Sequence, residues 1–240
     1  QELRLTYEGT ELGAQELYGQ MLEAMKGALF KRGDLNNNRV TEAPELISIV
    51  VGVDPSLVGD KDAMGVVVVG RARNDHLYVL ADETLKSAGR DAALHCWRTL
   101  IKYDAGMVVY EENLGKKWME QVFKDAWFEL VKSGEAPENT SPPMRGIDAK
   151  LGKKTRAEPV AMRSEQSRLH MVGDHGDLED ELVLFTSWDG KESPNRPDAM
   201  VHACRHHMEM ERNKGKIISP DDLRPDGFGS TYNPGIDFGW

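Results

Sequence analysis

The sequence predicts an α/β protein in which helices flank a mixed central sheet. Apolar runs of strand length alternate with segments whose apolar residues recur every three or four positions. The polar pair Asn74 and Asp75 separates two apolar runs, which is typical of a tight turn between antiparallel strands. The runs at 46–53 and 107–110 are joined by a path that contains a helical segment, so these two strands are expected to lie parallel.

Six strands are expected. The largely apolar run from Leu46 ends at Asp54 and Pro55, which are unfavourable inside a strand. The segments on either side of the turn at 74–75 provide the second and third strands, so the first three strands form an antiparallel meander. Short apolar runs account for the remaining three. The expected strands span 46–53, 63–72, 76–81, 107–110, 146–149 and 169–172.

Five helices are expected in the same region. Ala92, Cys96 and Leu100 share one face of the first, and a similar apolar face recurs in the second. Pro197 lies just inside the start of the last helix, where its fixed backbone angle is pre-organised. Loops are expected at 133–143 and 186–195. The expected helices span 88–103, 118–131, 154–166, 177–185 and 197–214.

The flanks of residues 46–214 differ from this region. Residues 1–45 are expected to be a lead-in, with a helix over 17–29 and an irregular connector where Arg32, Gly33 and Asp34 break the pattern. Residues 215–240 are rich in Pro and Gly and are expected to form an extended tail. The chain does not begin with methionine, which favours a fragment or a processed product.

The composition narrows the class of protein. The chain has 240 residues, of which 40% are hydrophobic and 29% charged, as in soluble globular proteins. No apolar run reaches the roughly 18 residues of a membrane helix, so no membrane contact is expected. Two cysteines without a CxxC spacing favour a reducing compartment. The net charge of −10 argues against a nucleic-acid coat, but it is compatible with an enzyme that holds nucleic acid through one basic patch.

Three acids occupy positions that predict a metal site. Asp54 and Glu111 each follow an apolar strand, and Asp198 lies in the first turn of the last helix. If that helix packs near the first strand, the three carboxylates converge and need positive charge to remain ionised. Oxygen ligands favour Mg²⁺ or Mn²⁺, and two such ions can support phosphodiester hydrolysis. The alternative is that each acid caps a helix or lies on the solvated surface.

Five short segments carry a resemblance to a known family. They are GVDPS at 52–56, KDAMG at 61–65, VVYEENLG at 108–115, KTRAEPV at 154–160 and SPNRPDA at 193–199. In this order they resemble the C-terminal nuclease domain of the large terminase subunit of tailed bacteriophages, which has a ribonuclease H-like fold. The resemblance implies that 46–214 is the nuclease domain and that 1–45 links it to an ATPase domain outside this sequence.

The resemblance also implies an activity and partners. It implies that Asp54, Glu111 and Asp198 are the catalytic, metal-binding triad for two Mg²⁺ or Mn²⁺ ions, with Asp62 as a possible fourth acid. The implied activity is the cutting of double-stranded DNA concatemers during genome packaging. The implied partners are DNA, the ATPase domain, the portal protein and the small terminase subunit, at the procapsid portal in the host cytoplasm. Asn195 departs from the family pattern, which often has an acid there.

Two functional alternatives remain open from the sequence. One is another ribonuclease H-like nuclease, of the resolvase or transposase type, which substrate choice would distinguish. The other is a non-catalytic docking domain whose acids are structural.

A local reversal of charge predicts a DNA contact. Residues 145–168 contain seven basic and three acidic residues, a net charge of +4 in an acidic chain. Lys and Arg side chains supply most of the affinity for DNA through phosphate contacts. The alternative is a solvated helix face. The expected DNA-binding residues are Lys116, Lys117, Lys150, Lys153, Lys154 and Arg156.

Two histidines on the last helix are weaker candidates for metal binding. His202 and His206 lie four residues apart, a spacing that can bind zinc, but no third ligand follows at a suitable spacing. His202 lies one turn after Asp198, so it can approach the acids or serve in packing. The Gly152–Lys154 segment lacks the pattern of a phosphate-binding loop, so no nucleotide cofactor is expected.

Overall fold

The computed structural model describes residues 28–54, 63–112, 116–148, 152–184 and 195–214. These residues form a mixed six-stranded sheet with the strand order β5-β4-β1-β2-β3-β6. The strands are β1 (Leu46–Asp54), β2 (Gly65–Ala72), β3 (Leu77–Asp82), β4 (Met107–Glu112), β5 (Met144–Asp148) and β6 (Leu169–Met171). β1, β2 and β3 form the predicted antiparallel meander. β4 runs parallel to β1, which confirms the predicted crossover.

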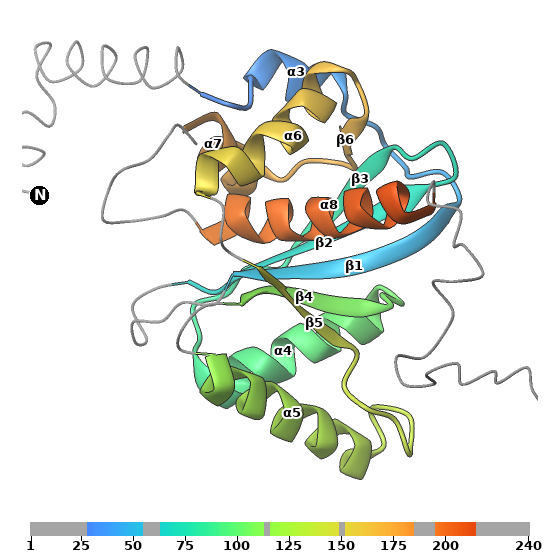
Figure 1. The fold of residues 1–240 in the computed structure, drawn as a ribbon, viewed down its shortest axis with the longest axis vertical. Helices are drawn as coiled ribbons and strands as arrows, with labels where there is room; N and C mark the ends of the chain where they lie inside the picture. The colour runs from blue at the N-terminus through green and yellow to red at the C-terminus, as the bar shows by residue number, and fades with distance from the viewer. Residues whose placement is uncertain (1–27, 55–62, 113–115, 149–151, 185–194, 215–240) are drawn as a thin grey trace, which may run out of the picture.

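Helices cover both faces of the sheet (Figure 1). One face carries α4 (Gly89–Lys102) and α5 (Lys116–Ser133). The other carries α8 (Asn195–Lys214) directly on the strands, with α6 (Lys153–Glu165), α7 (Gly176–Leu184) and α3 (Arg32–Asn37) around it. Among the described helices, none is both long enough and apolar enough to cross a membrane.

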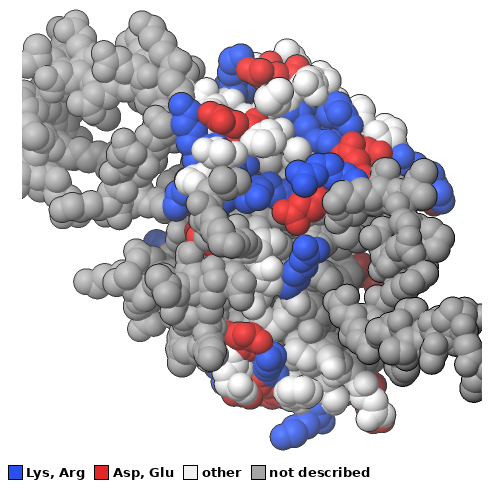
Figure 2. All heavy atoms as spheres, in the orientation of Figure 1, with Lys and Arg blue, Asp and Glu red and all other residues white. Residues whose placement is uncertain are grey.

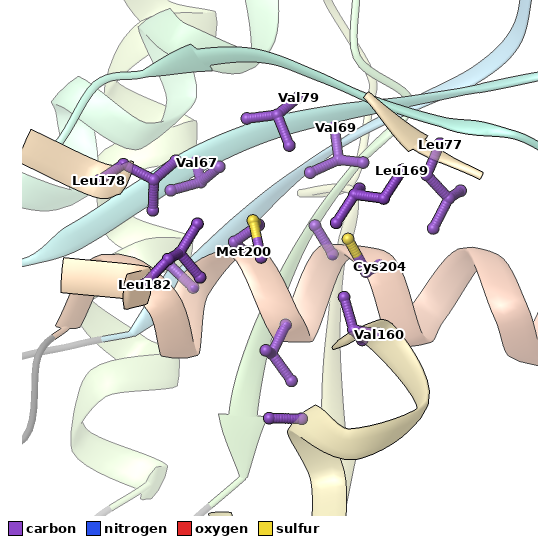
Figure 3. Close-up of a cluster of buried hydrophobic side chains, with 14 of the residues drawn as sticks. Val67, Val69, Leu77, Val79, Val160, Leu169, Leu178, Leu182, Met200 and Cys204 are labelled. Atoms are coloured by element: carbon purple, nitrogen blue, oxygen red, sulfur yellow. The ribbon is translucent and has the colours of Figure 1, made fainter. Parts of the chain in front are cut away.

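The two faces of the sheet divide the core in two. Alternate residues of β2 point to opposite faces, so Val67 and Val69 pack toward α8 while Val66 and Val68 pack toward α4. Figure 3 shows the first cluster, in which Met200 and Cys204 of α8 meet the valines of the sheet. All of β2 is buried, as is typical of a central strand covered on both faces.

The connector before β1 differs from its prediction. Residues 32–37, expected to be irregular, form the short helix α3. Leu35 has only 1% of its surface exposed, and the side-chain amide of Asn38 donates a hydrogen bond to the carbonyl of Ser164 at 2.6 Å. Packing against α6 and α7 therefore stabilises a helix that its local sequence does not signal. The expected tail at 215–240 and residues 17–27 of the expected helix at 17–29 lie outside the described residues, and residues 28–29, which are described, are not helical.

Two glycines allow α8 to approach the sheet closely. A methyl group on Gly52 of β1 would overlap the backbone carbonyl of Ala199, and one on Gly65 of β2 would overlap that of Asn195. Both carbonyls belong to the first turns of α8. The absence of side chains at Gly52 and Gly65 therefore positions the start of α8 against the ends of β1 and β2.

We expect Gly52→Ala to lower the free energy of unfolding by about 1–3 kcal/mol, because the added methyl group forces α8 away from β1. Urea denaturation measures this change. Gly33→Ala in α3 is the matched control, because a methyl group there meets no neighbouring atom within 4 Å. Equal stability of Gly52→Ala and the parent chain would contradict the close packing of α8 on β1.

Candidate metal centre

Three elements bring the predicted acids to one edge of the sheet. Val53 of β1 is paired with Tyr110 of β4 in parallel register, so Asp54 and Glu111 follow side by side at the strand ends. Asp198 lies in the first turn of α8 and is 2% exposed. The close packing of α8 on Gly52 brings this turn to the same edge. The sequence therefore correctly predicted the elements that carry the three carboxylates.

The carboxylates are close enough to interact electrostatically. The pKa of Asp54 is raised to about 8, mainly by burial and then by the negative charges of Asp198 and Glu111, while Lys153 and Arg156 oppose the shift. Burial is the largest cause of this shift, and the two nearby carboxylates add negative charge that Lys153 and Arg156 only partly offset. A divalent cation supplies the missing positive charge, so the site has the chemistry of a cation site.

Two cations of α6 face the acids. Lys153 Nζ lies 2.6 Å from Asp198 Oδ2, and a guanidinium nitrogen of Arg156 lies 2.5 Å from Glu111 Oε2. The two residues are three apart, so they lie on the same face of α6. The first half of α6 therefore forms the wall of the site that partly balances its negative charge.

The structure places the predicted DNA-binding residues in different environments. Arg156 is 3% exposed and is directed to Glu111, so it is buried in the site and does not offer a surface contact to phosphate. Lys153 is partly exposed and paired with Asp198, whereas Lys154 is exposed. The side chains of Lys116, Lys117 and Lys150, and the whole of Asp62, lie outside what the structure describes.

Much of the basic segment is paired within the domain. Arg163 is ion-paired with Glu211 and donates a hydrogen bond to the carbonyl of Asp75. Arg145 lies 3.5 Å from Glu209. Figure 2 shows Lys and Arg gathered over α3, α6 and α8 on the visible face, with acids among them. The net charge of the segment therefore overstates the positive surface that is available to a ligand.

His202 of α8 joins the acids. The side chains of Asp54, Glu111 and His202 each offer an oxygen or nitrogen atom, and these atoms all lie within 4.8 Å of one another. His202 is fully buried, and burial lowers its pKa to about 4, so the imidazole is neutral at pH 7. The sequence indicated this proximity only through the one-turn spacing from Asp198. His206 is not part of this group.

The sheet order and the flanking helices define a ribonuclease H-like fold, as predicted. No family model and no curated protein matches the sequence. Among solved structures, the chain is similar to the nuclease domain of the large terminase subunit gp2 of bacterial virus Sf6. The TM-score is 0.55 at 14% identity, over 74% of this chain and 98% of that chain.

Two further solved structures share this fold. A variant of the Sf6 nuclease domain, solved with manganese and β-thujaplicinol, has a TM-score of 0.52 at 15% identity, over 74% of this chain and 98% of that chain. The large terminase of bacteriophage HK97 has a TM-score of 0.52 at 10% identity, over 74% of this chain and 43% of that chain. At these identities the similarity establishes the fold.

Proposed function

We propose that this chain is a metal-dependent endonuclease domain of a viral terminase large subunit, which cuts double-stranded DNA during genome packaging. The observation that carries the proposal is the meeting of Asp54, Glu111 and Asp198 at one edge of a ribonuclease H-like sheet. The similarity in fold to terminase nuclease domains supports the proposal of a terminase nuclease over other nucleases of this fold. The proposed partners beyond DNA, namely the ATPase domain, the portal protein and the small terminase subunit, rest on the sequence resemblance.

The three carboxylates are proposed to hold the divalent cations. Bound there, Mg²⁺ or Mn²⁺ would activate water and neutralise the charge that develops on a scissile phosphate. The raised pKa of Asp54 supports this role, because a cation at the edge favours the ionised carboxylate. Arg156 holds the Glu111 carboxylate in place, and Lys153 does the same for Asp198, so both acids are oriented before a cation arrives.

The function is tested with purified protein and supercoiled plasmid DNA. We expect nicked and then linear product with Mg²⁺ or Mn²⁺, and none with EDTA. Asp198→Asn is expected to remove the cleavage while the protein remains folded. Asp91→Asn, an exposed acid in the first turn of α4, is the matched control and is expected to cleave normally. Cleavage by Asp198→Asn at the parental rate would overturn the assignment of this residue.

The same assay separates the proposed terminase role from the resolvase alternative. A linear duplex and a four-way DNA junction of the same sequences are supplied in competition. The proposed function predicts cleavage of the linear duplex without preference for the junction. Cleavage confined to the junction would favour a resolvase, and the absence of cleavage on every substrate would favour a docking domain.

We expect Lys154→Ala to weaken binding to duplex DNA uniformly across sequences, because Lys154 is exposed and directly follows Lys153, which contacts Asp198. The slope of log affinity against log salt is expected to fall by about 0.9 for one lost phosphate contact. Fluorescence anisotropy over a salt series measures both effects. Lys132→Ala, an exposed lysine on α5 across the sheet, is the control. An unchanged slope for Lys154→Ala would assign that lysine to the solvated surface.

A further inference from the structure

His202 is a buried side chain whose polar atoms make no hydrogen bond to any residue that the structure describes. It is 0% exposed, and neither Nδ1 nor Nε2 has a hydrogen-bond partner among the described residues. Burial of an unpaired polar group is costly, so such groups call for an explanation. His207 on the same helix shows the usual solution, because its Nε2 donates a hydrogen bond to the carbonyl of Val69 at 3.0 Å. His202 therefore faces the acids, and the described part of the chain offers it no hydrogen-bond partner of the kind that a packing role would require.

The distance from His202 to Glu111 fits a shared cation better than a direct bond. His202 Nε2 lies 3.6 Å from Glu111 Oε2, which is too long for a hydrogen bond. Two ligands that each bind one ion at roughly 2.1 Å lie about 3–4 Å apart in tetrahedral or octahedral geometry. Asp54 completes a group whose three ligand atoms lie within 4.8 Å of one another. These separations leave space for an ion among the three side chains.

We propose that Nε2 of His202 is a ligand of the divalent cation held by Asp54 and Glu111, and that this nitrogen makes the site favour manganese over magnesium. The inference rests on the proposed metal site and extends it to a residue outside the predicted triad. Mg²⁺ binds mainly oxygen ligands and water, whereas imidazole nitrogen suits later divalent metals better. A site made only of carboxylates would lack this preference.

Electron paramagnetic resonance of Mn²⁺ bound to the protein tests the inference directly. We expect the spin-echo spectrum of the parent protein to show modulation by a ¹⁴N nucleus coordinated to the ion. His202→Leu is expected to remove this modulation and to weaken Mn²⁺ binding by at least about tenfold, while Mg²⁺ binding measured by calorimetry is unchanged. Leucine suits a buried position whose polar atoms are unpaired, so the variant is expected to fold.

The controls separate failure of the inference from failure of the proposed function. His206→Leu makes the same substitution one turn further along α8 and is expected to keep the modulation. His202→Asn serves as the second variant if leucine prevents folding. Mn²⁺ that binds the parent protein without ¹⁴N modulation, or modulation that persists in both His202 variants, would overturn the inference and leave the carboxylate site intact. Failure of the parent protein to bind Mn²⁺ would overturn both this inference and the proposed metal-dependent function.

Discussion

Replacing Asp54 with asparagine is expected to reduce plasmid cleavage at least about a thousandfold, because the proposed metal catalysis would supply several kcal/mol of transition-state stabilisation. Asparagine has nearly the same shape but lacks the negative charge that would hold a cation at the end of β1. The initial rate of supercoiled plasmid loss, with Mg²⁺ or Mn²⁺ in excess, measures the effect.

The same substitution is expected to stabilise the metal-free protein at high pH. The pKa of Asp54 is raised from 3.8 to about 8, so the folded chain keeps a proton in a range where the unfolded chain has lost it. The free energy of unfolding therefore falls as the pH rises from about 4 to about 8. An asparagine side chain cannot ionise, so Asp54→Asn lacks this decline and gains on the order of 5 kcal/mol at pH 8 relative to the parent.

Thermal unfolding in EDTA at pH 5 and pH 8 measures this difference. Added Mn²⁺ is expected to stabilise the parent at pH 8 by binding the folded state, and to have little effect on Asp54→Asn. Asp91→Asn is the matched control for both readouts, because its carboxylate is exposed on the other side of the sheet. Cleavage by Asp54→Asn at the parental rate would contradict the proposed role of Asp54. So would a free energy of unfolding that rises more between pH 5 and pH 8 in the parent than in Asp54→Asn.

Replacing Arg156 with methionine is expected to destabilise the fold by about 3 kcal/mol. Arg156 and Glu111 form a buried ion pair, with side chains 4% and 10% exposed. Removing one partner of a buried pair leaves the other charge uncompensated, which costs more than the pair itself contributes. Methionine keeps most of the side-chain length, so the change isolates the loss of charge. Urea denaturation at pH 7 in EDTA measures it.

A divalent cation is expected to restore part of the stability lost in Arg156→Met, because it supplies positive charge beside Glu111. Arg98→Met is the matched control, since Arg98 pairs with Glu135 on the exposed surface and is expected to alter the urea midpoint little. Equal effects of the two substitutions would show that Arg156 is not a buried counter-charge. If a cation restores none of the stability, the proposed role of Glu111 in metal binding is contradicted.

The regular elements were largely predictable because their signals are local. Strand runs and helical spacing identified the meander, the crossover to β4 and the helix that carries Asp198. The short helix α3 was not predicted, because it contains one buried apolar residue, Leu35, and periodicity needs several. Its stability comes from contacts with α6 and α7, which are distant in the sequence.

Only part of the candidate site could be predicted from the sequence. The elements that carry the three acids could be predicted, because each acid follows an apolar strand or begins a helix. The partner of a basic residue could not be predicted in the same way, because it can lie far away in the sequence. Arg156, for example, pairs with Glu111, which is 45 positions away. Composition therefore suggested a surface contact for Arg156 where the structure has a buried ion pair. The role of His202 was left open for the same reason, since spacing along one helix does not show what lies opposite it.

The sequence by itself determined the order of strands and helices and the positions of Asp54, Glu111 and Asp198 at their ends, because these features depend on neighbouring residues. Only the tertiary structure decided that α8 packs on Gly52, that Lys153 and Arg156 face the acids, and that His202 is buried beside them. Those outcomes depend on which surfaces meet when the chain folds. Burial then raises the pKa of Asp54 and lowers that of His202, because the charged form of each side chain loses its contact with water.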